Sequence, residues 1–147
     1  MNKIQIGKRE IVHFIGIGGI GMSGLAQIMK TMGFNVQGSD LNENKNTDNC
    51  KKLGIKILKN YSKKNILNAT IIVKSSAIKK NNIELLYSKK RKIPSYDRIE
   101  MLANIIDLKK KIIVTGSHGK TTTTSLVAKI ISTARLDPTI INGGVIN

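Results

Sequence analysis

Residues 16–21 form a glycine-rich run, Gly-Ile-Gly-Gly-Ile-Gly, and this run constrains the fold more than any other feature of the 147-residue sequence. An apolar, β-branched segment at residues 11–15 precedes it. In residues 22–32, which follow it, apolar side chains recur at helical spacing (Met22, Leu25, Ile28, Met29, Met32). Glycines at the first, third and sixth positions allow a tight turn and a close approach of backbone to a diphosphate. The pattern predicts the strand, loop and helix that begin a doubly wound α/β sheet.

An acidic residue follows these glycines at an informative distance. Residues 35–40 are predicted to form a second strand that ends in Asp40, after Gly33 has terminated the helix. An acid about 20 residues after a G-x-G-x-x-G run is typical of ribose recognition in nucleotide-binding domains. We therefore expect a nucleotide or dinucleotide diphosphate site; the alternative for Asp40 is a turn residue after a strand.

The next segments continue the alternation of helix and strand. A short helix is predicted over residues 46–53, ended by Gly54, and strands over residues 55–58 and 70–74. Ser75-Ser76-Ala77-Ile78 follows the last of these strands, at the carboxyl edge where doubly wound sheets bind ligands. Small hydroxyl residues there suit a phosphate or a sugar, and an ordinary turn is the alternative.

Two helices and a short extended segment are expected before residue 107. The first helix covers residues 82–88, and residues 93–95 are extended because Pro94 resists both helix and central strand. The second helix covers residues 96–106, with an apolar side made of Ile99, Leu102, Ala103 and Ile106. Residues 107–110 are the expected domain junction, which places one domain at 1–107 and the beginning of another at 108–147.

A second phosphate-binding loop is predicted at residues 116–122. The apolar run 111–115 reads as a strand, and residues 125–131 have helical spacing of apolar residues. The loop is shorter than the common G-x-x-x-x-G-K-[ST] pattern, since Val114 stands five residues before Gly119. Lys120 is expected to reach the terminal phosphates of a nucleoside triphosphate, and the Thr121 hydroxyl to ligate Mg²⁺. A turn with a solvated lysine is the alternative.

Charge and composition argue against several other classes of protein. The net charge of +16 invites a nucleic-acid interpretation, but only four of the 25 basic residues are arginine, and stacking aromatics do not alternate with them. We therefore expect no nucleic-acid partner. A single cysteine, Cys50, forms no internal disulfide and favours a reducing, cytoplasmic setting. No signal-peptide pattern opens the chain, and no apolar run has the length of a membrane span.

Four stretches together resemble the Mur ligases, in the right order along nearly the whole chain. They are residues 13–23 (His-Phe-Ile-Gly-Ile-Gly-Gly-Ile-Gly-Met-Ser), 38–40 (Gly-Ser-Asp), 75–78 (Ser-Ser-Ala-Ile) and 116–123 (Gly-Ser-His-Gly-Lys-Thr-Thr-Thr). Members that add later residues of the peptide usually carry Asn in place of His118. The murein tripeptide-recycling member shares the histidine but differs at the first glycine loop. The resemblance is strongest to members that join L-alanine to UDP-N-acetylmuramate.

The resemblance implies an activity and a set of site residues. Such ligases use ATP to phosphorylate the muramyl carboxylate, and the amine of L-alanine then attacks the acyl phosphate, in peptidoglycan synthesis. It implies that Lys120 is catalytic, that Thr121 ligates Mg²⁺, and that ATP is bound by Gly116, Ser117, His118, Gly119, Lys120, Thr121 and Thr122. It further implies a UDP-sugar pocket lined by Gly16, Gly18, Gly19, Ile20, Gly21, Met22, Ser23, Ser39, Asp40, Ser75, Ser76 and Ala77.

The chain is much shorter than the three-domain ligases it resembles. We expect an amino-terminal piece that binds the UDP-sugar but does not form the amide bond alone, because L-alanine requires the carboxyl-terminal domain. Residues 111–147 lack neighbours to bury their apolar side chains, so they are expected to dock on the first domain, to self-associate, or to be poorly ordered. Two other interpretations stay open: an NAD(P)-binding domain of an oxidoreductase or regulator, and a basic binding module.

Overall fold

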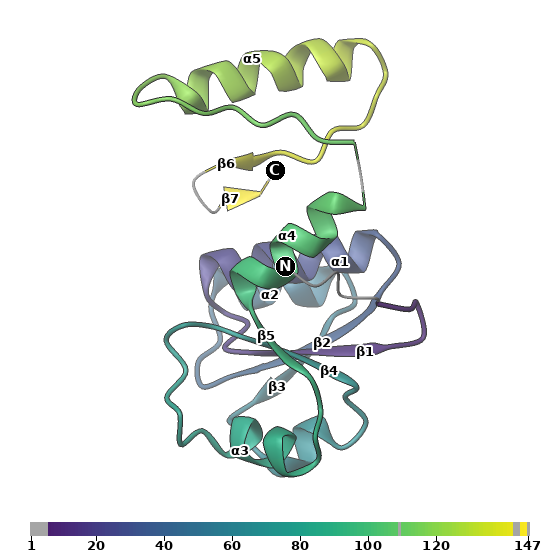
Figure 1. Ribbon diagram of the computed structural model, residues 1–147, viewed down its shortest axis with the longest axis vertical. Coiled ribbons are helices and arrows are strands. Elements are labelled where there is room, and N and C mark those ends of the chain that lie inside the picture. Colours follow the sequence, from purple (N-terminus) through teal and green to yellow (C-terminus); the bar gives the residue numbers. More distant parts are fainter. Residues whose placement is uncertain (1–5, 109, 143–144, 147) are drawn as a thin grey trace.

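A parallel five-stranded sheet forms the centre of the fold (Figure 1). The computed structural model describes residues 6–108, 110–142 and 145–146. The strand order is β3-β2-β1-β4-β5, and every neighbouring pair in this sheet is parallel. The strands are β1 Ile11–Ile15, β2 Asn35–Asp40, β3 Lys56–Lys59, β4 Ile71–Lys74 and β5 Ser95–Asp97. This order confirms the predicted doubly wound α/β fold and places a switch of winding direction between β1 and β4.

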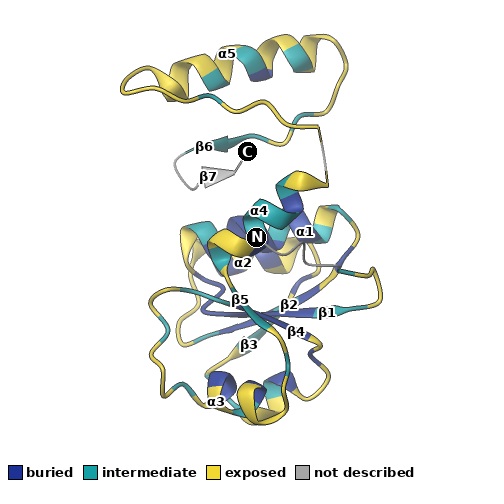
Figure 2. Cartoon of the chain, in the orientation of Figure 1, coloured by how far each residue is buried: buried dark blue, intermediate teal, exposed yellow. Residues whose placement is uncertain are grey.

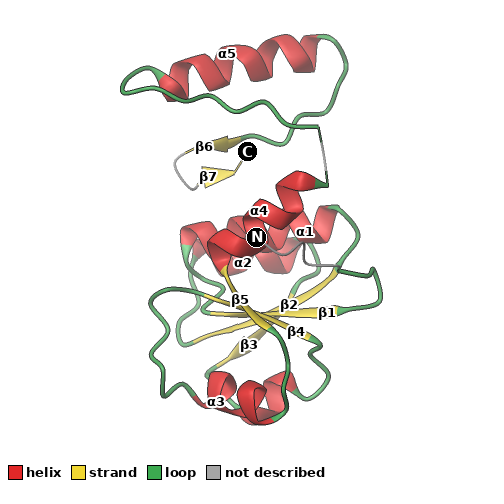
Figure 3. Cartoon of the chain, viewed as in Figure 1, coloured by secondary structure: helices red, strands yellow, loops and turns green. Residues whose placement is uncertain are grey.

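Helices cover both faces of this sheet (Figure 3). Three of them lie on one face: α1 Ile20–Thr31, α2 Lys45–Lys52 and α4 Arg98–Asp107. The other face is covered by α3 Ile83–Lys90 and the short 3₁₀ helix η1 Lys63–Ile66. The 3₁₀ helix was not predicted. A covered sheet of this kind needs strands that are apolar on both sides, as in the run Ile-Ile-Val of β4.

Alternating side chains of β1 divide the core into two halves. Val12 and Phe14 belong to the cluster under α1, α2 and α4, whereas Ile15 packs with Ile66 and Leu85 on the α3 side. Successive residues of a strand point to opposite faces, so this division follows directly from the sequence. Figure 2 shows that burial is concentrated in the sheet and in the inward sides of its helices.

Helix α1 buries the apolar face that its sequence predicts. Met22, Leu25, Ile28 and Met29 are buried, and Met32 is partly buried against the same cluster. Gly33, with a φ of +84°, follows the last helical turn in the left-handed conformation that favours glycine. Helix α2 begins with a capping box between Asn44 and Thr47.

The predicted apolar side of α4 was wrong in part. Met101 and Ile105 are the buried residues, Leu102 is partly buried, and Ile99 is 69% exposed. Apolar residues occur almost all round this helix, so periodicity did not determine which side would face the sheet. The helix begins at Arg98 rather than at Tyr96, because Tyr96 pairs with Val73 in the sheet.

The segment after residue 110 forms a smaller unit beyond α4 (Figure 1). It contains helix α5 Lys120–Thr133 and a short antiparallel pair, β6 Ile141–Asn142 and β7 Val145–Ile146. Residues 111–115, predicted as a strand, have no strand partner among the described residues, and Ile112 and Ile113 are 67% and 75% exposed. An extended segment becomes a strand only when another strand accepts its backbone hydrogen bonds.

Only part of this unit packs against the sheet domain. Ile141 contacts the main core cluster, whereas Leu126 and Ile130 of α5 are 62% and 70% exposed. Residues 143, 144 and 147, within the predicted second unit, lie outside the described residues. No helix in the described ranges is long and apolar enough to cross a membrane.

Candidate functional site

The first glycine loop is anchored to the end of β2. Gly16 has a φ of +80°, and the amides of Gly16 and Ile17 both donate to the Ser39 carbonyl, at 2.9 and 3.1 Å. The loop therefore turns immediately after β1, at the carboxyl edge of the sheet where the winding direction changes. Ligands of open α/β sheets bind at this place.

The peptide groups around Gly18 are held by three polar side chains. The Gly18 amide donates to Asp40 Oδ2 at 2.7 Å, and the Gly18 carbonyl accepts from Asn46 Nδ2 at 2.8 Å and Asn44 Nδ2 at 3.2 Å. Asp40 Oδ1 also accepts from the amide of Asn42 at 3.2 Å. The acid predicted to bind ribose is thus engaged with the loop itself, and it fixes the loop's shape.

Asn44 and Asn46 were not among the predicted site residues. Their amides hold the Gly18 carbonyl from the beginning of α2, 26 and 28 residues along the chain. The only sequence signal was a concentration of asparagine after Asp40. Asparagine there is equally expected for a helix cap, and Asn44 has that role as well.

The turn after β4 lies directly against the first loop. A Cβ built on Gly16 would be 3.1 Å from Ile78 Cδ1 and 3.4 Å from Ser75 Cβ. The Ser75 amide donates to the Ile15 carbonyl at 3.2 Å, while Ser76 and Ala77 are exposed. The structure therefore brings together the two predicted parts of the UDP-sugar pocket, residues 16–21 and 75–77.

Several predicted pocket residues are directed into the protein. Met22 and Ser23 are buried, and the Ser23 hydroxyl donates to the Ile20 carbonyl at 3.0 Å. Ser39 is fully buried, and its hydroxyl donates to Glu84 Oε2 at 2.6 Å. These three side chains shape the loop from within, whereas Gly19 and Ile20 face outward, with Ile20 61% exposed.

Ser39 belongs to a buried polar network between the sheet and α3. His13 Nε2 lies 3.3 Å from Glu84 Oε2 and 3.2 Å from Ser39 Oγ. Gln37 Nε2 donates to the Asn65 carbonyl at 2.8 Å and contacts His13 Nδ1 at 3.1 Å. His13 Nε2 therefore faces the Glu84 carboxylate and the Ser39 hydroxyl, while Nδ1 faces the Gln37 side-chain amide.

The carboxylate of Glu84 is ionised within this network. Burial raises the pKa of Glu84. Hydrogen bonds from His13 and Ser39, the electrostatic attraction of His13 and the hydrogen bond from the Ser62 amide together lower this pKa below its ordinary value. Asn65 Nδ2 also donates to Glu84 Oε1, at 2.6 Å. A buried charge is tolerated when its lone pairs are all used in this way.

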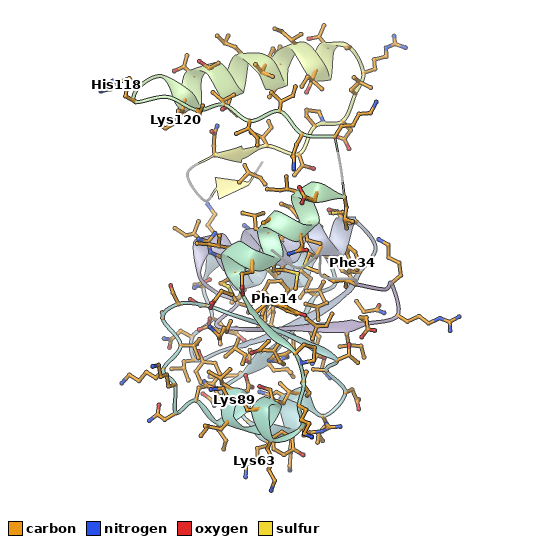
Figure 4. The ribbon with its side chains drawn as sticks, viewed as in Figure 1. Phe14, Phe34, Lys63, Lys89, His118 and Lys120 are labelled. Atoms are coloured by element: carbon orange, nitrogen blue, oxygen red, sulfur yellow. The ribbon has the colours of Figure 1, made fainter. Side chains whose placement is uncertain are left out.

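The second predicted loop turns at two glycines immediately before α5. Gly116 and Gly119 have φ of +152° and +75°, and α5 begins at Lys120. Lys120 Nζ donates to the carbonyls of Gly116 at 2.5 Å and Ser117 at 3.2 Å, so it folds back over its own loop. His118 and Lys120 lie at the exposed end of α5 (Figure 4). The structure does not bring this loop to the first glycine loop.

A metal site at the second loop is predicted through Thr121. Nowhere in 6–108, 110–142 or 145–146 do three His, Cys, Asp or Glu side chains gather as metal ligands do. The Thr121 hydroxyl, in the first turn of α5, fits a single Mg²⁺ ligand of the kind that phosphate oxygens complete.

The chain is similar to known proteins along nearly its whole length. Residues 11–110 match the family model described as "Mur ligase family, catalytic domain". A UDP-N-acetylmuramate–L-alanine ligase of Pelagibacter ubique is 66% identical over 145 residues, which are 99% of this chain and 31% of that protein. Another from Rickettsia bellii is 54% identical over 94% of this chain and 29% of that protein.

The fold is also that of solved Mur ligases. The UDP-N-acetylmuramate-alanine ligase of Thermotoga maritima superimposes with a TM-score of 0.77 and 35% identity, over 90% of this chain and 31% of that one. The chain therefore spans less than a third of the length of the curated relatives it matches. The family match itself extends over the sheet domain, from the first residue of β1 to just beyond α4. On this evidence, the chain belongs to the Mur ligase family.

Proposed function

We propose that this chain is the amino-terminal part of a UDP-N-acetylmuramate–L-alanine ligase, and that residues 1–107 bind the UDP-sugar. The observation that carries the proposal is the first glycine loop, which is pinned at Gly18 and packed beside the Ser75–Ala77 turn at the switch of the sheet. Relatives with that activity are 54–66% identical over nearly the whole chain.

In this proposal the backbone recognises the diphosphate. Amides at the start of α1, with Gly19 and Ile20 exposed, provide donors and a favourable helix dipole. Ser75, Ser76 and Ala77 offer small side chains and hydroxyls to the same ligand. Met22, Ser23, Ser39 and Asp40 act by holding the loop in shape, rather than through free side chains.

Residues 108–147 begin an ATP-binding unit in the same proposal. The loop Gly116–Thr122 would surround the phosphates, and Lys120 would exchange its contacts with loop carbonyls for a terminal phosphate oxygen. A bound Mg²⁺ would neutralise phosphate charge, with the Thr121 hydroxyl as one of its ligands.

The reaction proposed for the whole protein is amide-bond formation in peptidoglycan synthesis. The muramyl carboxylate takes the terminal phosphoryl group of ATP, which releases ADP. The amine of L-alanine then attacks the acyl phosphate, loses a proton, and displaces inorganic phosphate. No residue of this chain is assigned to L-alanine, so we expect the isolated chain to bind the UDP-sugar without completing the reaction.

Calorimetric titration of the 147-residue chain tests the UDP-sugar site. UDP-N-acetylmuramate is expected to bind more tightly than NADH, which is the ligand of the competing oxidoreductase interpretation. Tighter binding of NADH would reverse the conclusion. ATP, titrated with Mg²⁺, tests the second loop separately.

An activity assay tests whether the isolated chain is unable to complete the reaction. ATP, Mg²⁺, UDP-N-acetylmuramate and L-alanine are supplied together, and phosphate release is measured with and without L-alanine. Turnover that depends on L-alanine would show that the isolated chain is a complete catalyst, contrary to the proposal.

A further inference from the structure

Arg98, the first residue of α4, lies across the beginning of α1. A Cβ built on Gly21 would be 2.8 Å from Arg98 Nη1, 2.9 Å from Cζ and 3.1 Å from Cδ. The arginine side chain therefore runs over Gly21, the last glycine of the first loop, and its guanidinium is at the loop itself. Gly21 has an ordinary backbone conformation, so its lack of a side chain is required for this contact rather than for the turn.

The acids nearest to Arg98 in the sequence are engaged elsewhere. Asp97 forms an ion pair with Lys74, at the carboxyl end of β4. Glu100 Oε2 accepts from the Asp97 amide at 2.8 Å, as part of the capping box of α4. Within the described part of the chain, no hydrogen bond or ion pair is formed by the Arg98 guanidinium.

A partly buried guanidinium without an acidic partner is an unused anion-binding group. It carries five donors in a planar fork that matches two phosphate oxygens at once. The first turn of α1 beneath it contributes backbone amides and the positive end of the helix dipole. The Asp97 carboxylate is paired with Lys74, so the positive charge of Arg98 is available to an anionic ligand.

We propose that Arg98 binds the diphosphate of the UDP-sugar, and that Gly21 is a glycine because any side chain there would displace the guanidinium. The inference rests on the proposed function and adds to it a charged side chain that the glycine pattern did not reveal. Arg98 directly follows β5 and lies 77 positions after Gly21 in the sequence. Binding of the diphosphate thereby connects α1 with α4.

Two substitutions test the proposal through different residues. Arg98→Ala is expected to weaken UDP-N-acetylmuramate binding by about tenfold to a hundredfold, the range of charge-assisted hydrogen bonds. Arg98→Lys is expected to restore part of this loss, because it keeps the charge but not the bidentate fork. Arg9→Ala, an equal loss of charge at the amino-terminal edge of β1, is the matched control and should leave binding unchanged.

Gly21→Ala separates binding from folding. Alanine has a higher helix propensity than glycine. The nearest atoms to the added Cβ all belong to the flexible side chain of Arg98. Thermal stability is therefore expected to be retained while binding weakens about as much as in Arg98→Ala. The double variant should bind no worse than either single variant, because both remove the same contact.

The outcomes distinguish this inference from the proposed function. If the parent chain does not bind UDP-N-acetylmuramate, the proposed function fails and the role of Arg98 with it. If the parent binds and both Arg98→Ala and Gly21→Ala bind equally well, only the role of Arg98 is overturned. Uridine, followed by chemical-shift titration, gives a further check. A loss for uridine as large as for the UDP-sugar would place the effect of Arg98 in the fold and not at the phosphates.

Discussion

Ser39 donates its hydroxyl proton to Glu84 across the sheet–α3 interface, with 2.6 Å between Oγ and Oε2. The same Ser39 accepts the Gly16 and Ile17 amides through its carbonyl. One residue therefore connects the glycine loop on the carboxyl edge of the sheet to a buried charge beneath it. The position of the loop is thereby connected to a polar network whose central side chains, His13, Ser39 and Glu84, are fully buried.

Replacing the buried carboxylate should therefore destabilise the domain. In Glu84→Gln, the amide NH₂ faces donors from Ser39, His13 or Asn65, and at least one buried group loses its partner. We expect the free energy of unfolding to fall by roughly 1–3 kcal/mol, as measured by urea denaturation. Glu43→Gln is the control, because Glu43 is exposed and its pair with Lys51 contributes little. Equal stability of the two variants would contradict the importance of the network.

The same carboxylate makes stability depend on pH in the acid range. The pKa of Glu84 is lower in the folded chain than in the unfolded chain. Its contribution is therefore complete above the unfolded pKa of about 4.3 and is lost as the pH falls below it, toward the folded pKa. Denaturation curves at pH 7 and at pH 3–4 should show a smaller loss of stability in Glu84→Gln than in the parent. A parallel loss in both would assign the acid sensitivity to other groups.

A side chain at Gly18 should abolish recognition of the UDP-sugar. A Cβ there would be 2.9 Å from Asp40 Oδ2 and 3.0 Å from Asn44 Nδ2, so Gly18→Val displaces the groups that hold the loop. We expect UDP-N-acetylmuramate binding to weaken at least about 100-fold, as measured by calorimetry. Gly7→Val, with only Glu10 Cγ within 4 Å, is the matched control. A folded Gly18→Val that binds as tightly as the parent would remove this loop from the site.

The two predicted phosphate loops should be separable by substitution. Among the residues that the structure describes, Lys120 Nζ donates hydrogen bonds only to carbonyls of its own loop, those of Gly116 and Ser117. Lys120→Ala is therefore expected to leave the dissociation constant for UDP-N-acetylmuramate within about twofold of the parent. ATP binding, titrated in the same preparation, should weaken. A large loss for the UDP-sugar would mean that the two loops serve one ligand.

Cys50 should react slowly with thiol reagents until the domain unfolds. It is fully buried, donates to the Ser23 carbonyl, and has a pKa that burial raises to about 11. The thiolate is the reactive form, so at pH 8 the folded chain offers almost none of it. Ellman's reagent should modify Cys50 rapidly in denaturant and slowly in buffer. Rapid modification under both conditions would show that α2 opens readily from the sheet.

Local sequence patterns predicted much of the fold and the place of the first glycine loop in it. The apolar spacing of residues 22–32 identified the buried side of α1, and the glycines at 16, 18 and 21 identified the turn after β1. These features depend on residues close together in the chain, where helical periodicity and glycine conformation act directly. The succession of strands and helices likewise predicted the doubly wound sheet, since parallel strands require crossover connections.

Contacts between distant residues were decided only by the tertiary structure. Ile99 is exposed because α4 turns Met101 and Ile105 to the sheet, a choice that its nearly uniform apolar sequence left open. Residues 111–115 have strand composition but no strand partner among the described residues. The binding of Ser39 to Glu84 and the position of Arg98 over Gly21 join residues 45 and 77 positions apart. Sequence spacing carries no signal for such pairs, because packing of α3 and α4 on the sheet brings them together.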